Sequence, residues 1–267
     1  MISVIVPSYK PQSYIWDCLD SIRNQTLGHN QYETIIVLNG CNEPFKTQIE
    51  DYIKQYESEW TIRLIQTDTP GVSNARNLGI KNSIGEFVTF VDDDDIVSSC
   101  FLEKLLVVSS SSCVGCSNSV IFDSSLEKTS DNFISLAYRE CKGEEYSILK
   151  FRKFLSPPVG KLLHKDIIGD DRFPDNLEKS EDSVFCLKLT PRIKEMRLTD
   201  EDAIYYQRKR MGSATRSKNS FGYEFRALCK LEVAYLKIWL RHPFRYNVLF
   251  VLSRMAGGFR NFLSYVR

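Results

Sequence analysis

Four short apolar runs separated by helical patterns constrain the fold of this 267-residue chain more than any other feature. The runs are rich in β-branched and aromatic residues, which is typical of buried strands, and they occupy residues 2–6, 33–38, 61–65 and 87–91. Apolar residues recur at helical spacing in residues 14–25, 43–56 and 72–83. This alternation predicts crossover units, and therefore an α/β fold with a mostly parallel sheet flanked by helices.

Polar residues follow three of the predicted strands. Pro7-Ser8-Tyr9 ends the first, Asn39-Gly40 ends the second, and Asp92 to Asp95 end the fourth. Ligands of such sheets bind beyond the carboxyl ends of the strands, so we expect the three tips to share one rim. Four adjacent carboxylates repel one another, and a divalent cation that bridges them to phosphate oxygens explains the run. A solvated acidic turn is the alternative.

Charge is unevenly distributed along the chain. From Arg208 onward there are thirteen Lys and Arg against Glu224 and Glu232, so the net charge of +1 combines a basic end with an acidic body. This asymmetry indicates an anionic partner for the basic end. A nucleic-acid partner is not expected, because the basic end carries no nucleic-acid-binding motif.

Cysteine usage and hydropathy indicate the compartment. Eight cysteines are scattered among apolar residues and no secretory leader precedes the first strand, which predicts reduced thiols in a cytoplasmic protein. Cys113 and Cys116 have metal-like spacing but no second pair, so no zinc site is expected. No apolar run approaches the roughly 20 residues that span a bilayer.

The chain changes character after residue 218. Leu228, Leu231, Tyr235 and Ile238 recur at helical spacing, and a second helical pattern from Val248 to Val266 is interrupted at Gly257-Gly258. We expect an α/β domain over residues 1–218 and a basic, amphipathic helical extension over 219–267. The extension can dock on the domain, form an oligomer interface or lie peripherally on an anionic membrane.

Several segments carry a resemblance to a known family. They are Val4 to Tyr9, Cys18 to Thr26, Gly71 to Ile80, Gly85 to Asp95, Gly160 to Leu162, Phe173-Pro174, Ser180 to Phe185 and Tyr205 to Thr215. In this order they resemble the family 2 glycosyltransferases of the GT-A (Rossmann-like) fold, of the inverting type found in bacterial polysaccharide biosynthesis. The resemblance implies a hexosyl- or N-acetylhexosaminyltransferase that moves a sugar from a nucleotide sugar, with UDP favoured, to a saccharide or polyprenyl-diphosphate-linked acceptor.

The resemblance also implies roles for the residues at the strand tips. Asp92 and Asp94 correspond to a DxD element that binds Mn²⁺ or Mg²⁺. Pro7, Tyr9, Asn39, Arg76, Asp92 and Asp93 are the expected nucleotide-binding residues. The ring of Tyr9 can stack on uracil. Asn39 stands where relatives usually carry an aspartate that contacts the base, and Asn39-Gly40 can also be only a tight turn. Arg76 can pair with the base edge or the aspartates, or lie on a helix surface.

Asp182 corresponds to the catalytic base of the family, and Glu181 to a contact with the acceptor or the donor sugar. Composition alone favours the alternative, in which Glu181 and Asp182 are only the acidic residues that commonly begin a helix. The basic turn from Tyr206 to Thr215 is either a lid that binds the donor diphosphate or a solvated loop. His164 is expected to be structural. A nucleotide-sugar pyrophosphorylase would need a glycine-rich loop after the first strand, which this chain lacks. A degenerate member that binds nucleotide sugar or glycan without catalysis remains the alternative.

Overall fold

The computed structural model describes residues 1–177, 179–210 and 220–266. Its main sheet has the strand order β10-β6-β9-β4-β1-β2-β3. The bounds are β1 Ile2–Ser8, β2 Tyr32–Asn39, β3 Ile62–Thr67, β4 Phe87–Phe90, β6 Cys113–Cys116, β9 Lys161–His164 and β10 Glu195–Leu198. Neighbouring strands run parallel except at β9, which is antiparallel to both β4 and β6.

A smaller four-stranded sheet has the order β5-β11-β7-β8. Its strands are β5 Ile96–Val97, β7 Asn118–Phe122, β8 Thr129–Asp131 and β11 Ile204–Arg208. Because β5 directly follows the aspartate run and pairs with β11, this sheet brings the end of β11 beside the tip of β4.

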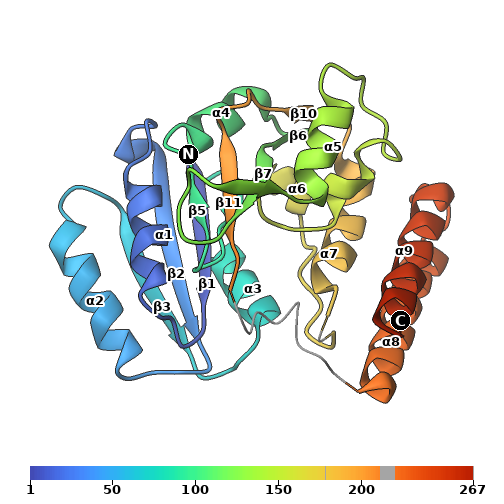
Figure 1. The fold of residues 1–267 in the computed structure, drawn as a ribbon, viewed down its shortest axis with the longest axis horizontal. Coiled ribbons are helices and arrows are strands. Elements are labelled where there is room, and N and C mark those ends of the chain that lie inside the picture. The colour runs from blue at the N-terminus through green and yellow to red at the C-terminus, as the bar shows by residue number, and fades with distance from the viewer. Residues whose placement is uncertain (178, 211–219, 267) are drawn as a thin grey trace.

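The described helices are α1 Tyr14–Arg23, α2 Phe45–Tyr56, α3 Val72–Asn82, α4 Phe101–Val108, α5 Phe133–Cys141, α6 Lys165–Ile168, α7 Glu181–Leu189, α8 Phe221–Arg241 and α9 Val248–Val266, with short 3₁₀ helices at His29–Gln31, Phe151–Leu155 and Thr190–Arg192. Helices α1 to α6 contact strands of the sheets (Figure 1), which confirms the predicted α/β architecture. Every residue of β1 and β2 is buried, which is why these strands are continuous apolar runs rather than alternating patterns.

A glycine sets the distance between α3 and β1. A Cβ at Gly79 would lie 2.4 Å from Cγ2 of Ile5, so only glycine allows this close approach. Arg76 lies three residues earlier on α3, on the same helical face. The close packing therefore holds Arg76 against the sheet, where it is only 4% exposed.

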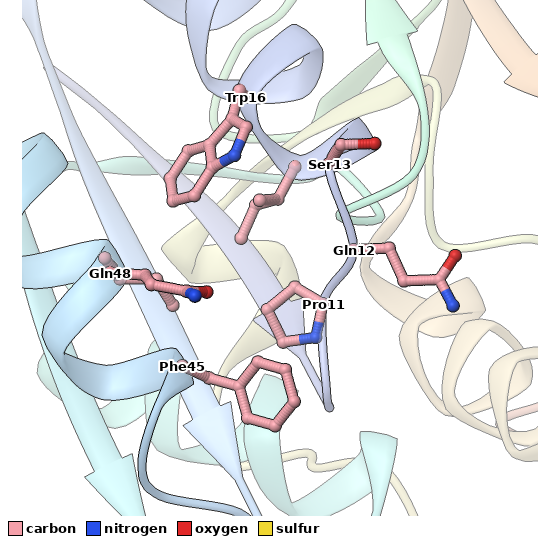
Figure 2. Close-up of a pocket in the computed structure, with 8 residues that line it drawn as sticks. Pro11, Gln12, Ser13, Trp16, Phe45 and Gln48 are labelled. Atoms are coloured by element: carbon pink, nitrogen blue, oxygen red, sulfur yellow. The ribbon is translucent and has the colours of Figure 1, made fainter.

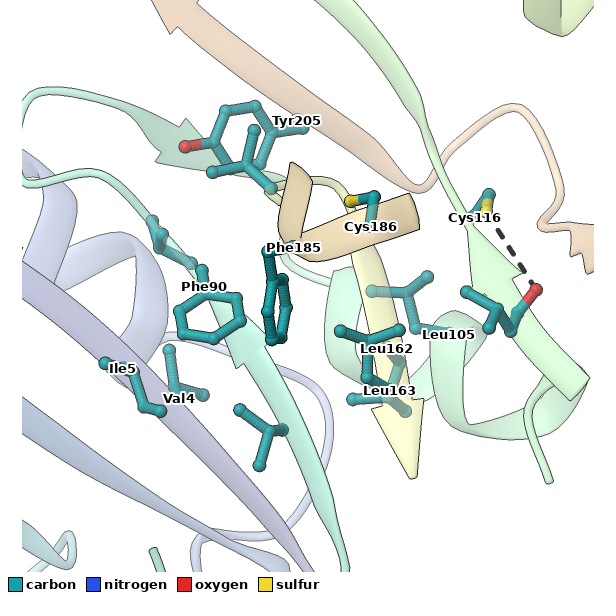
Figure 3. Packing of buried hydrophobic residues seen from close by; sticks show 14 of the residues in the cluster. Val4, Ile5, Phe90, Leu105, Cys116, Leu162, Leu163, Phe185, Cys186 and Tyr205 are labelled. Atoms are coloured by element: carbon teal, nitrogen blue, oxygen red, sulfur yellow. Dashed lines mark hydrogen bonds between the residues drawn. The ribbon is translucent and has the colours of Figure 1, made fainter. Parts of the chain in front are cut away.

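Aromatic packing holds α7 beside β4. Phe173 and Phe185 stack with ring centroids 3.9 Å apart, and Phe90 of β4 meets Phe173 edge-on at 5.4 Å. Figure 3 shows Phe185 and Phe90 side by side in the core. The first turn of α7 is thereby fixed near the carboxyl end of β4.

Helices α8 and α9 form a hairpin that packs beside α7 at one end of the molecule (Figure 1). Leu228, Leu231 and Tyr235 are buried, and the Tyr235 hydroxyl lies 2.6 Å from Oγ of Ser183 in α7. The expected interruption at Gly257-Gly258 was wrong, because α9 continues through both glycines. Gly258 instead allows close approach to α8, since a Cβ there would lie 2.6 Å from Oε1 of Glu232. The boundary expected at residues 218 and 219 lies outside the described residues.

Candidate active site

The three strand tips meet at one rim of the main sheet, as expected from the order β4-β1-β2. The Ser8 hydroxyl donates to Oδ2 of Asp93 over 2.6 Å, which ties the end of β1 to the aspartate run. Asn39 Nδ2 donates to the Ser8 carbonyl over 2.7 Å. Asn39 Oδ1 accepts from the Gly71 amide over 2.9 Å. Asn39 thus links the tips of β1 and β2 to the start of α3.

Asn39 is more than a turn residue, because its side chain is buried and bonded at both ends. Gly40, with φ of +62°, takes the conformation that the turn requires. One lone pair of the Asn39 amide oxygen and one N–H remain for a ligand. Pro7 is buried within β1, whereas Tyr9 stands at the rim with 52% of its surface exposed.

Arg76 joins the aspartate run to the start of α7. Its Nη1 donates to Oδ1 of Asp182 over 2.6 Å and lies 3.4 Å from Oε1 of Glu181. Its Nη2 donates to Oδ1 of Asp92 over 3.0 Å. The guanidinium also faces the Phe173 ring at 5.4 Å. A single buried cation thus connects Asp92 to two adjacent carboxylates, Glu181 and Asp182, which follow it by about 90 residues.

Asp182 lies in the first turn of α7 and is 28% exposed. Burial raises the pKa of Asp182 to about 7, against the opposing effect of the Arg76 charge. Such a carboxylate holds a proton more firmly than an ordinary aspartate and is closer to the basicity that proton abstraction needs. The acidic start of α7 is therefore also part of the ion-pair cluster around Arg76.

The end of β11 supplies two further cations to the aspartate run. Arg210 Nε lies 2.5 Å from Oδ2 of Asp94, and Arg208 Nε donates to the Asp94 carbonyl over 2.9 Å. The Arg208 amide donates to Oδ1 of Asp95 over 2.8 Å. Of the predicted basic turn, Arg208 and Arg210 thus lie against the aspartates, and residues 211–215 fall outside the described part of the chain.

Tyr205 is a site residue that sequence reasoning did not single out. Its hydroxyl donates to Oδ2 of Asp95 over 2.7 Å and accepts from the Asp92 amide over 3.1 Å. Burial of the ring, followed by the charge of Asp95, raises the Tyr205 pKa well above its usual value. The phenol therefore stays protonated and shapes the loop that carries the aspartates. The only sequence feature that could have pointed to Tyr205 is its position in the pair Tyr205-Tyr206, directly before the basic turn.

The residues at this rim fit a divalent cation. Burial, followed by the charge of Asp92, raises the pKa of Asp94, so a cation near the two carboxylates is favourable. Guanidinium groups of Arg76 and Arg210 provide the positive charge here. Within the described residues there is no group of three or more His, Cys, Asp or Glu arranged to hold a metal ion. An ion held by Asp92 and Asp94 alone would take most of its ligands from phosphate and water.

Three features lie apart from the rim. A cavity of about 500 Å³ between α1 and α2 is lined by neutral residues and by none of the residues above; Figure 2 shows Pro11, Trp16 and Phe45 around it. His164 caps α6 by accepting from the Asp166 amide, which agrees with a structural role. Cys113 and Cys116 are both buried in β6.

Comparison with known proteins gives consistent similarities. The family description "Glycosyl transferase family 2" matches residues 3–162. The poly(ribitol-phosphate) β-N-acetylglucosaminyltransferase TarS of Staphylococcus aureus is 25% identical over 239 residues, which is 86% of this chain and 40% of that protein. The chain therefore spans well under half the length of this relative.

Two solved structures are similar in fold. A fragment of S. aureus TarS in complex with UDP-GlcNAc has a TM-score of 0.69 at 23% identity, covering 88% of this chain and 66% of the fragment. The mannosyltransferase PcManGT of Pyrobaculum calidifontis, in complex with GDP-Man and Mn²⁺, has a TM-score of 0.58 at 14% identity, covering 88% and 63%. Both likenesses concern the arrangement of the sheet and its helices.

Proposed function

The chain belongs to glycosyl transferase family 2, and we propose that it transfers a hexosyl or N-acetylhexosaminyl group, with inversion, from a UDP-sugar to a saccharide or lipid-linked acceptor. The observation that carries the proposal is the Arg76 guanidinium, which connects Asp92 at the tip of β4 to Asp182 on α7. The proposed donor-binding and proton-accepting groups thus face one another across a single side chain. We place this reaction in the synthesis of a cell-surface polysaccharide.

The proposed donor site begins with the exposed ring of Tyr9, which can stack on uracil. Asn39 can offer its remaining lone pair and N–H to the base edge, while its bonds to Ser8 and Gly71 position the strand tips. Asp92 and Asp93 would border the ribose and diphosphate. Binding of UDP-GlcNAc by the structurally similar TarS supports a uridine donor.

Asp92 and Asp94 are the residues that would hold Mn²⁺ or Mg²⁺. When bound, such an ion neutralises the charge that develops on a departing diphosphate. Arg208 and Arg210 lie against Asp94 and can turn toward phosphate oxygens, which guanidinium groups bind in a bidentate manner. The complex of PcManGT with GDP-Man and Mn²⁺ supports metal use in this fold.

Asp182 is the proposed general base. Inverting transfer is a direct displacement, so one base must accept the proton of the acceptor hydroxyl as that hydroxyl attacks the sugar. Arg76 orients the Asp182 carboxylate over 2.6 Å and favours its ionised form, whereas closure of the site over substrate would raise its basicity. Glu181, on the same turn, is the proposed contact with the acceptor or donor sugar.

A panel of nucleotide sugars, assayed for Mn²⁺-dependent release of UDP, tests the proposal. We expect turnover with at least one UDP-sugar, loss of turnover in Asp94→Asn, and loss of transfer with retained donor binding in Asp182→Asn. Asp123→Asn, which removes an exposed carboxylate just after β7, is the matched control. Full activity of wild type in excess chelator would contradict the metal role, and binding without turnover of any donor would support a degenerate, non-catalytic member.

The helical hairpin is the proposed contact with an anionic membrane. Large apolar side chains are exposed along it, namely Phe221, Phe225, Val233, Leu236, Leu240, Phe244, Val248, Leu249, Leu252, Phe259 and Leu263. Exposed Lys237, Arg241 and Arg260 lie among them. Within the described residues, no helix is long and apolar enough to cross a membrane. An apolar surface with basic flanks suits a helix pair that lies in the plane of an anionic surface.

Vesicle sedimentation tests this contact. The double variant Leu240→Ser/Phe244→Ser should lose binding to anionic vesicles while remaining folded, because both side chains are largely exposed. Val107→Ser, which alters an exposed apolar residue on α4, should bind like wild type. Equal binding of wild type to neutral and anionic vesicles would contradict the electrostatic part, and no binding to either would favour a docking or oligomer role for the hairpin.

A further inference from the structure

The cavity between α1 and α2 has no role in the proposed reaction. Its volume of about 500 Å³ falls within the range of about 300–1,000 Å³ that is typical of small-molecule pockets. The buried Ile15 side chain belongs to its apolar lining, and the half-buried Trp16 and Phe45 present aromatic rings. Gln12, Ser13 and Gln48 add neutral polar groups. We call this feature the α1–α2 cavity.

The aromatic rings offer apolar faces. Figure 2 shows the rings of Trp16 and Phe45 on either side of the cavity and the Gln48 side chain directed between them. Trp16 also stacks on Tyr52 of α2, with ring centroids 5.3 Å apart and planes at 22°, so its ring is held in place. The face of an aromatic ring carries partial negative charge, and the C–H groups on one side of a sugar ring can pack against it.

The polar groups of the α1–α2 cavity are available to a ligand. Among the described residues, the side chains of Gln12, Ser13 and Gln48 have no hydrogen-bond partner. A carboxamide has two N–H donors and an acceptor oxygen, and a hydroxyl both donates and accepts. Neighbouring hydroxyls of a sugar also donate and accept, so they match such groups.

The lining of the α1–α2 cavity contains no charged residue. Charged side chains next to the lining in the chain have other contacts: Lys10 with the Tyr9 ring, Asp17 with Arg208, Glu43 with Thr47, and Lys46 with Glu50. A phosphate group would therefore find no cation in this lining, whereas an uncharged ligand needs none.

Helix α1 lies between the cavity and the aspartate run. Its Tyr14 and Asp17 contact Arg210 and Arg208, whereas Ile15 and Trp16 line the cavity. Gln12 follows Tyr9 by three residues, so their Cα atoms are at most about 11 Å apart. The cavity is thus near the proposed donor site but separate from it, and α7 with the proposed base lies on the other side of β1 and β4 (Figure 1).

We propose that the α1–α2 cavity binds one uncharged sugar unit of a glycan chain, at a position separate from the reacting groups. This inference goes beyond the proposed function, because it assigns a second saccharide site that takes part neither in donor binding nor in proton transfer. On a growing polysaccharide, the site would hold a unit remote from the reacting end.

Calorimetric titration of the whole chain with maltohexaose, cellohexaose and chitohexaose tests the proposal, since all three probes are uncharged. Gln48→Ala is the test variant, because this side chain is exposed and bonded to no described residue. Loss of one hydrogen bond should raise the Kd of the bound probe roughly two- to tenfold. Gln55→Ala is the matched control, since Gln55 is exposed on the same helix, two turns later and outside the lining, and should bind like wild type.

Trp16→Phe locates the bound sugar. It retains an aromatic ring, so binding should persist, but the change in tryptophan fluorescence on binding should disappear although Trp60 and Trp239 remain. A fluorescence change that persists in Trp16→Phe would place the sugar elsewhere and overturn the proposal. Equal affinity of wild type and Gln48→Ala, or binding of octanol but of no oligosaccharide, would also overturn it.

Competition with UDP and Mn²⁺ separates this inference from the proposed function. Oligosaccharide binding that is unchanged by saturating UDP and Mn²⁺ supports a separate site, whether or not the protein turns over any donor. Displacement of the oligosaccharide by UDP would place it at the strand tips and overturn the inference, as would the absence of binding to all three probes.

Discussion

Replacement of Arg76 by methionine is the sharpest perturbation of the rim. Methionine keeps an unbranched side chain beside Phe173 but removes the guanidinium that contacts Asp182, Asp92 and Glu181. Three carboxylates then lose their shared cation. We expect a folded but less stable protein without transferase activity, because the proposed base and the proposed metal ligands are no longer positioned relative to one another.

The expected loss of stability follows from burial. Breaking a buried ion pair by removing one partner costs about 3–5 kcal/mol. Asp182 and Asp92 are 28% and 37% exposed, so solvent screens part of this cost and about 3 kcal/mol is expected at pH 8. The Arg76 charge lowers the Asp182 pKa, so its removal raises this pKa further above about 7. A raised carboxyl pKa in the folded state makes the free energy of unfolding fall as pH rises toward that pKa. The stability deficit of Arg76→Met relative to wild type should therefore be larger at pH 8 than at pH 6.

Urea unfolding at the two pH values measures the deficit. Saturating Mn²⁺ should stabilise the variant more than wild type, because the ion restores a positive charge at Asp92 and Asp94. Arg139→Met, which breaks an exposed pair with Asp131, is the matched control and should cost little. A deficit for Arg76→Met that stays below about 1 kcal/mol, as for a surface ion pair, and does not change with pH would refute the reasoning.

Two further predictions concern carboxyl groups whose pKa is raised. The rate of sugar transfer by the wild-type enzyme should fall as pH drops below about 7, because Asp182 is then protonated and cannot take the proton of the acceptor hydroxyl. A kcat/KM profile that is flat from pH 5.5 to about 8 would contradict this prediction. Burial without a hydrogen-bond partner raises the Glu232 pKa from 4.5 to about 7, so the wild-type protein loses stability as pH rises through that range. Glu232→Gln removes this charge and should therefore stabilise the hairpin at pH 8 by about 1–3 kcal/mol. Urea unfolding at pH 5 and at pH 8 checks the latter, and an equal effect at both would count against it.

The first half of the main sheet was predictable from the sequence because its strands are covered on both faces. β1 and β2 are buried along their whole length, so the apolar runs stand out without any knowledge of their neighbours. The meeting of Ser8, Asn39 and the aspartates at one rim followed from the parallel arrangement. Their bonds to one another agree with that prediction.

The strands after residue 110 were not predictable in this way. β6 is the four-residue segment Cys113–Cys116, which includes Gly115, and its burial depends on tertiary packing rather than on a local pattern. A Cβ at Gly115 would lie 2.4 Å from Oγ of Ser109, so the glycine is required by close packing that no window of sequence reveals.

Long-range ion pairs were also beyond a local pattern. Arg76 and Asp182 are 106 residues apart, and nothing in α3 or α7 alone indicates that they meet. The contact of Arg210 with Asp94 likewise depends on the pairing of β11 with β5. Pairing of Arg76 with the aspartate run was one of the expected alternatives and is confirmed at Asp92, whereas the contacts of Arg76 with Asp182 and of Arg210 with Asp94 emerged only from the fold.

The reversed strand β9 has a consequence for synthesis on the ribosome. It lies between β4 and β6, so the main sheet cannot be completed until residues 161–164 have left the exit tunnel. The segment β1 to β4 can pair earlier, since its four strands are contiguous in both chain and sheet. A nascent chain stalled before residue 161 would therefore present β4 as an open edge, and the three strand tips could meet before the helix that carries the proposed base is made.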